Sequence, residues 1–124
     1  MELHIVHVDS VDVNSYGVVS LLFKIDPSDK PDVFDKIDFI NDSKERNYSF
    51  PFNLKDKFVF HYKGSLTTPL CDPFVDWFVY MEPFPIRKNN LDKIKSAVNQ
   101  GQINSRYIQN LNGRSIELIG GLCN

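Results

Sequence analysis

The chain has 124 residues, of which 42% are hydrophobic, and a formal net charge of −2 at pH 7. This length and apolar content suffice for one small domain or for part of a larger one. The slightly acidic balance argues against nucleic acid or an anionic membrane as a partner, because both select a basic surface. No apolar run in the sequence reaches the length of a transmembrane helix.

The first third of the chain predicts two strands and a helix. Residues 2–8 form a short strand, and residues 16–25 form a largely apolar strand that we expect to be buried on both faces. A helix is predicted over about 31–41, because Asp29 can cap it, Pro31 suits its first turn, and apolar residues follow at helical spacing.

The remainder alternates strands with turns. Residues 42–57 are polar and predict a surface loop, and residues 58–62 and 74–81 predict strands. A short amphipathic helix is expected over about 89–99 and a closing strand over 115–119. The pattern is mostly sheet with helices outside it. Strands this apolar need neighbours, so we expect a missing segment or another chain to complete the sheet.

The first strand carries the first chemical signal. Alternate residues of a strand share a face, so Glu2, His4 and Val6 point one way and His7 points the other. His4 and His7 therefore cannot chelate one metal from a regular strand. Glu2 can accept the spare ring N–H of His4, an arrangement that fixes the tautomer of a metal-bound histidine. On these residues alone, an ordinary polar pair is the simpler interpretation.

A second motif makes the first one specific. The run Gly-Ser-Leu-Thr-Thr-Pro occupies 64–69, Trp77 follows eight residues later, and Glu-Leu-His-Ile-Val-His occupies 2–7. Together these runs resemble the α-carbonic anhydrases, starting in the middle of that family's domain. The similarity continues to the closing segments 104–106 and 111–114.

The resemblance implies where the predicted elements belong. The fold class is β-rich α+β, and the strands would form part of the family's large, mixed, mainly antiparallel twisted sheet with short peripheral helices. Residues 1–124 would be the C-terminal half of one such domain, without a second domain.

The resemblance also implies a zinc enzyme that reversibly hydrates CO2 to bicarbonate. Members of the family hold zinc with three histidines, and the metal lowers the pKa of a bound water to about 7. By this comparison His4 is the third ligand and Glu2 stands behind it, while His7 is a hydrogen-bonded core residue. Thr67 would orient the attacking hydroxide, and Thr68 would line the polar side of the site.

The resemblance also implies residues that form the CO2 pocket and residues that support the Thr67 loop. CO2 has no dipole, so an apolar wall beside the metal suits it, although each matched residue taken alone is more simply a core residue. The matched wall consists of Val6, Val18, Leu66, Val75 and Trp77. Asn104 and Arg106 would tie the turn beneath the Thr67 loop. The chain departs from the family at Ser20, where a glycine is common, and also at Val8 and Leu70.

Several parts of the family's site have no counterpart in this sequence. These are the other two zinc ligands, the glutamate that partners Thr67, and a proton-shuttle histidine. We therefore expect the chain alone to be inactive and to need a complementary N-terminal half or segment. The alternatives are a non-catalytic carbonic-anhydrase-related protein that serves as a binding or scaffold element, and an unrelated β-rich binding domain.

The two cysteines, Cys71 and Cys123, fit no zinc motif, and a bridge between them is one option. By resemblance, Cys71 occupies a position that pairs in secreted and membrane-bound members with a cysteine near the domain's N-terminus. A reduced, buried cysteine is the alternative. Glycosylation acceptor patterns at Asn41 and Asn47 favour a secreted or extracellular-facing location, which is otherwise undetermined.

Overall fold

The computed structural model describes residues 1–12, 15–36, 57–98 and 102–120. The chain divides into two compact units, which we treat separately. The sheet unit comprises residues 2–22, 54–83 and 105–124, and the helix unit comprises Met1 with residues 23–53 and 84–104. The predicted loop at 42–57 lies outside the described residues except for Lys57.

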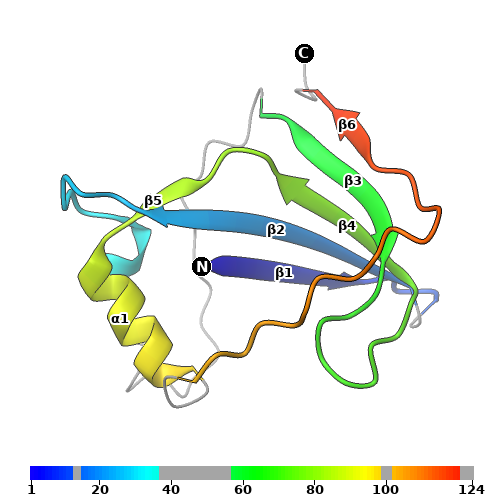
Figure 1. Ribbon diagram of the computed structural model, residues 1–124, viewed down its shortest axis with the longest axis horizontal. Coiled ribbons are helices and arrows are strands. Elements are labelled where there is room, and N and C mark those ends of the chain that lie inside the picture. The colour runs from blue at the N-terminus through cyan, green and yellow to red at the C-terminus, as the bar shows by residue number, and fades with distance from the viewer. Residues whose placement is uncertain (13–14, 37–56, 99–101, 121–124) are drawn as a thin grey trace. The chain divides into compact units, whose positions relative to one another are not determined.

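The strands form a mixed sheet with the path β1-β2-β4-β3-β6 (Figure 1). Their bounds are β1 Glu2–Val8, β2 Tyr16–Ile25, β3 Val59–Gly64, β4 Val75–Tyr80 and β6 Glu117–Ile119. β2 and β4 are parallel, whereas the other pairs on this path are antiparallel. The β-rich fold class and all five predicted strands are therefore confirmed.

The structure adds one strand that the sequence pattern did not predict. β5 spans Phe84–Ile86 and pairs in parallel with the end of β2, between Phe23 and Ile25. It is only three residues long, and its central residue is Pro85. A proline has no N–H to donate to a neighbouring strand, so a short run centred on Pro85 is not typical of a strand.

The two predicted helices have different outcomes. α1 spans Lys88–Ala97 and confirms the helix expected over about 89–99. Within the predicted helix at 31–41, the described part is a single 3-10 turn, Val33–Lys36, and residues 37–41 lie outside the description. The predicted cap at Asp29 is wrong, because its carboxylate bonds the guanidinium of Arg87.

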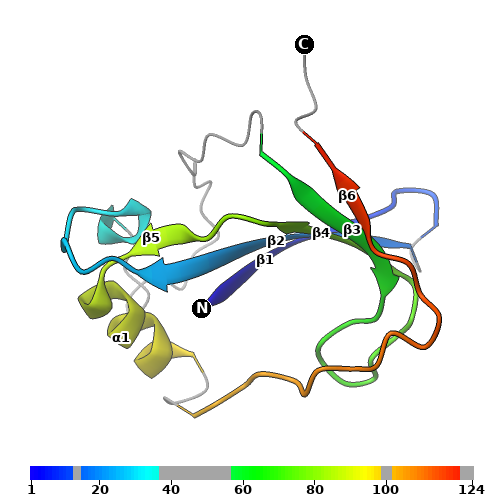
Figure 2. The same cartoon turned by 45° about the horizontal axis from the view of Figure 1, so that its top comes forward.

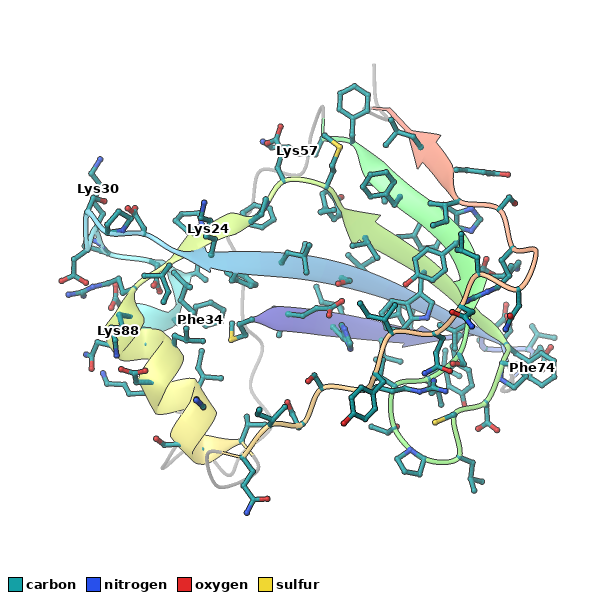
Figure 3. All side chains as sticks on the ribbon, in the orientation of Figure 1. Lys24, Lys30, Phe34, Lys57, Phe74 and Lys88 are labelled. Atoms are coloured by element: carbon teal, nitrogen blue, oxygen red, sulfur yellow. The ribbon has the colours of Figure 1, made fainter. Side chains whose placement is uncertain are left out.

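Asp32 caps the 3-10 turn in place of Asp29. Its carboxylate accepts the N–H of Phe34 at 2.8 Å, while its own N–H donates to Asp35 at 2.7 Å. Phe34 is buried and packs edge-on against Phe23, with ring centroids 5.1 Å apart (Figure 3). The turn is thus fixed by reciprocal polar contacts and one aromatic anchor.

The same aspartates anchor α1 inside the helix unit. The backbone N–H of Arg87 donates to Asp32, and the buried amide of Asn90 donates to both Asp32 and Asp35 at 2.9 Å. A carboxylate at the first residues of a helix also complements the helix dipole. The pKa of Asp35 is lowered, first by the Asn90 amide and then by the N–H of its own turn.

Strand alternation and register give the sheet unit two chemically different faces. Residues directly opposite each other share a face, so His4 pairs with Ser20, and Val6 pairs with Val18. Val18 in turn lies opposite Trp77, which lies opposite Tyr62. We call this the site face, because it carries Glu2 and His4.

The core of the sheet unit lies on the site face. Val18, Val75 and Trp77 are almost fully buried, and Leu66 and Tyr62 pack against them. β2 is buried on both faces as predicted, because Leu21 and Phe23 on its other face are also buried. Figure 2 shows the β3–β4 loop and the segment leading into β6 on the same side of the sheet.

We predict that Gly64→Ala destabilises the chain by about 1–3 kcal/mol, because overpacking a filled core has a cost of that size. A Cβ at Gly64 would lie 2.7 Å from Cδ1 of Trp77, which is too close for either atom to stay in place. The matched control is Gly17→Ala in β2, where a Cβ meets nothing within 4 Å. Urea unfolding of the two variants should separate them, and equal stabilities would contradict the packing described for Trp77.

A second prediction concerns the helix unit. Asn90→Ala should lower the free energy of unfolding by about 1–3 kcal/mol, because the buried amide joins both aspartates of the 3-10 turn. The control is Lys88→Ala, which removes an exposed pair with Asp92 on the same helix (Figure 3) and should cost less than about 0.5 kcal/mol. Thermal unfolding followed by circular dichroism compares them, and an equally small effect of both would refute the anchoring role of Asn90.

Candidate functional site

His4 lies on the site face of β1 and contacts both Glu2 and Trp77. Its ring meets the Trp77 ring edge to face, with centroids 4.9 Å apart and an interplanar angle of 74°. Its Nε2 is buried and lies 3.1 Å from Oε1 of Glu2. This contact is close but poorly aligned, so Nε2 makes no regular hydrogen bond.

Glu2 also contacts a neighbouring strand. The fully buried hydroxyl of Ser20 donates to the same oxygen, Oε1, at 2.5 Å. The pKa of Glu2 is lowered, chiefly by its contact with His4 and further by the Ser20 hydroxyl, while partial burial acts in the opposite direction. The carboxylate is therefore kept ionised next to the histidine ring.

An open cavity of about 400 Å³ lies over this part of the sheet unit. Glu2 from β1, Trp77 from β4 and Thr67 from the β3–β4 loop all line it. The segment before β6 lines it with Arg106, Tyr107, Ile108, Gln109 and Leu111. The structure thus brings together three residues that the sequence predicted for one site, although 65 positions separate Glu2 from Thr67 in the sequence numbering.

The loop that carries Thr67 and Thr68 is held from both sides. The N–H of Leu66 donates to the carbonyl of Asp72 at 2.9 Å, and the N–H of Cys71 donates to the carbonyl of Thr68 at 2.8 Å. Thr67 and Thr68 themselves are exposed. A closed loop of this kind fixes the backbone and leaves the threonine side chains accessible.

Arg106 reaches this loop from the segment before β6. Its Nη1 donates to Oγ of Ser65 at 2.7 Å and to the carbonyl of Leu66 at 3.0 Å. The Trp77 indole N–H donates to the carbonyl of Ser65 at 3.1 Å, so both contacts fix the start of the Thr67 loop. Asn104 is exposed and belongs to the helix unit, and its structural role remains a prediction.

The expected apolar wall is brought together in part. Val18, Val75 and Trp77 form the buried cluster, and Leu66 packs against it. Val6 shares the site face opposite Val18 but is 53% exposed. The wall is therefore continuous from Trp77 to Val18 and open to solvent at Val6.

The other histidines differ from His4. His7 was expected to be a buried, hydrogen-bonded residue, but it is exposed, because β1 lies at the end of the described sheet path. His61 lies on the face opposite the site, where it contacts Asp76 at 2.9 Å and stacks on Phe78. These are the contacts of an ordinary strand histidine.

The contact of Ser20 with Glu2 was not predicted from the sequence, in which Ser20 only replaces a common glycine. The available signal was the pairing of β1 with β2, which sets Ser20 opposite His4, but strand register is not visible in a single sequence.

The described residues supply only part of a metal site. Within residues 1–12, 15–36, 57–98 and 102–120, no three His, Cys, Asp or Glu side chains are grouped to hold a metal ion. The buried Nε2 of His4 facing a carboxylate fits one ligand with its outer partner, but a catalytic zinc needs three protein ligands. These residues alone do not fit a complete zinc centre.

The described residues include one cysteine and one α-helix, which bear on the predicted disulfide and on membrane crossing. Cys71 is a half-buried free thiol, whereas Cys123 and the acceptor patterns at Asn41 and Asn47 lie outside the described residues. α1 has ten residues, and no helix in the described ranges is long and apolar enough to cross a membrane.

Comparison with known proteins identifies the family. The family model of the eukaryotic-type carbonic anhydrases matches residues 1–119. Alpha carbonic anhydrase 3 of Arabidopsis thaliana is 33% identical over 132 residues, covering 95% of this chain and 45% of the relative. Carbonic anhydrase Nec1 of Nesocodon mauritianus is 28% identical over 129 residues, covering 95% and 47%.

A solved structure gives the same result. Carbonic anhydrase Cah3 from Chlamydomonas reinhardtii, in complex with acetazolamide, superposes with a TM-score of 0.72 at 25% identity, covering 94% of this chain and 56% of that one. The chain spans about half the length of the curated relatives it matches. Because the family model covers nearly the whole sequence and the sheet agrees, the chain belongs to the eukaryotic-type carbonic anhydrase family.

Proposed function

We propose that this chain supplies one side of a zinc-dependent site that reversibly hydrates CO2 to bicarbonate. The observation that carries the proposal is the contact of His4 with both Glu2 and Trp77, beside a cavity that Thr67 also lines. Family membership supports the reaction, and the relatives' greater length supports a source for the remaining ligands outside this sequence.

His4 is the proposed metal ligand. Its Nε2 faces the Glu2 carboxylate, which leaves Nδ1 as the ring nitrogen available to a metal. When bound, zinc acts as a Lewis acid that makes water nucleophilic near neutral pH. Glu2 holds the ring orientation and raises its basicity, while Trp77 restricts the ring from the side.

Thr67 and the apolar wall have complementary roles in the proposal. Thr67 lines the cavity, and its hydroxyl would accept a hydrogen bond from the attacking oxygen and so direct a lone pair toward CO2. Trp77 and Val18 give CO2 a surface that does not compete for hydrogen bonds. Thr68, on the same loop, would line the polar side of the site.

The second candidate is a non-catalytic member of the family that uses this surface for binding or as a scaffold. It is favoured by the presence of one proposed ligand, rather than three, among the described residues. The two candidates differ in whether a complementary N-terminal half completes a zinc site.

Fragment complementation tests the metal site. We expect the chain alone to bind Zn²⁺ weakly and to leave CO2 hydration at the buffer rate, because one imidazole cannot hold a catalytic zinc. Mixing it with the N-terminal half of a catalytically active relative should restore tight binding and hydration. In the mixture, His4→Ala should abolish tight binding, whereas His61→Ala, which alters a histidine on the opposite face, should leave it unchanged.

Calorimetry with Zn²⁺ and stopped-flow hydration assays give these readouts. Tight zinc binding and hydration by the chain alone would contradict the proposed ligand count. Assembly of the two halves without zinc binding would favour the non-catalytic candidate.

Thr67 is tested in the same complemented protein. Thr67→Ala should lower kcat by about 10–100-fold while zinc stays bound, because residues that support a metal site from outside its ligand set have effects of that size. Ser96→Ala on the exposed side of α1 is the control and should not change kcat. An unchanged kcat in Thr67→Ala would remove Thr67 from the proposed mechanism.

A further inference from the structure

We propose that Ser20 is a positioning residue that fixes the Glu2 carboxylate and, through it, the ring of His4. Among the described contacts, the Ser20 hydroxyl makes the one side-chain hydrogen bond that connects β2 to Glu2. The inference rests on the proposed function for its consequence, the orientation of a metal ligand. The positioning itself is a property of the metal-free chain.

The strand register places Ser20 where it can act. Ser20 lies directly opposite His4 in the antiparallel pairing of β1 with β2, on the same face. Glu2 is two residues before His4, so its side chain reaches diagonally across the strands to meet the Ser20 hydroxyl. Three side chains from two strands thus meet at one carboxylate oxygen.

Burial makes the serine the fixed partner of this contact. Ser20 is fully buried, whereas the Glu2 side chain is 45% exposed. A half-exposed glutamate has rotamers that point into water, and a hydrogen bond of 2.5 Å from a buried hydroxyl selects the inward one. Without that hydroxyl, the carboxylate is free to leave the ring.

The rotamer of Glu2 that Ser20 selects controls the contact between Glu2 and His4. Oε1 is shared, and the ring nitrogen approaches it at 3.1 Å without good alignment. Trp77 limits the ring on its other side, so the ring has little freedom to follow a moving carboxylate. The position of Oε1, which Ser20 sets, therefore determines whether buried Nε2 has an acceptor at all.

The experiment uses the metal-free chain labelled with 15N-histidine. We measure the tautomer of His4 from its ring 15N shifts and the exchange of its Nε2–H with water. Ser20→Ala should speed this exchange about tenfold, because the Glu2 oxygen that faces Nε2 loses the hydroxyl hydrogen bond that holds it beside the ring. Ser20→Thr, which restores a hydroxyl, should return exchange toward the original rate, and Ser96→Ala should leave it unchanged.

A double-mutant cycle separates positioning from general loosening of the core. If Ser20 acts through the carboxylate, Ser20→Ala should have little further effect on exchange in a Glu2→Ala background, where the hydroxyl has no carboxylate to hold. An equal effect in both backgrounds, or unchanged exchange in Ser20→Ala alone, would overturn the proposal. If the threonine variant does not fold, the cycle still decides. Because no metal is present, failure of zinc binding in the complemented protein would count against the proposed function and not against this inference.

Discussion

The parallel pairing of β2 with β4 is the constraint on which the site depends. It sets Trp77 beside Val18, and the antiparallel pairing of β1 with β2 then brings His4 against the Trp77 ring. Trp77 consequently belongs both to the buried core of the sheet unit and to the site. Its indole is held by the carbonyl of Ser65, and Gly64 leaves the space that it occupies.

The two faces of the sheet give His4 and His61 different chemical environments. On the site face, His4 lies between a carboxylate and an indole, and its Nε2 is buried. On the opposite face, His61 contacts Asp76, the pKa of whose carboxyl is lowered mainly by Lys63. In that second cluster Asp76 is paired with Lys63 and the His61 ring stacks on Phe78, so it resembles a structural ion pair rather than a ligand site.

Local patterns in the sequence predicted the strands and the faces on which their side chains lie, because both depend on residues close together in the chain. Alternation in residues 2–8 placed Glu2 with His4, and apolar runs located the five strands on the main path. The strands and their faces follow from spacing along one segment, which the sequence states directly. The motif at 64–69 linked Thr67 to the same site only through the family resemblance.

Features that depend on pairing between distant segments could not be predicted. The bond from Ser20 to Glu2 requires a register, and β5 forms around Pro85 only because the end of β2 lies beside it. The competing partner of Asp29 is Arg87, 58 positions away, which displaced it from the expected cap. His7 was expected to be buried by a family comparison, whereas its strand has an open side in the described sheet.

The site depends on the strand register that brings His4 onto Trp77 on one face of the sheet. Because the chain has a single tryptophan, nuclear Overhauser contacts between the His4 ring protons and the indole protons are unambiguous. The ring centroids are 4.9 Å apart, so strong cross-peaks are expected in the metal-free chain. Cross-peaks from His4 to Phe78 or Val19 on the opposite face, in place of Trp77, would contradict the register and the site built on it.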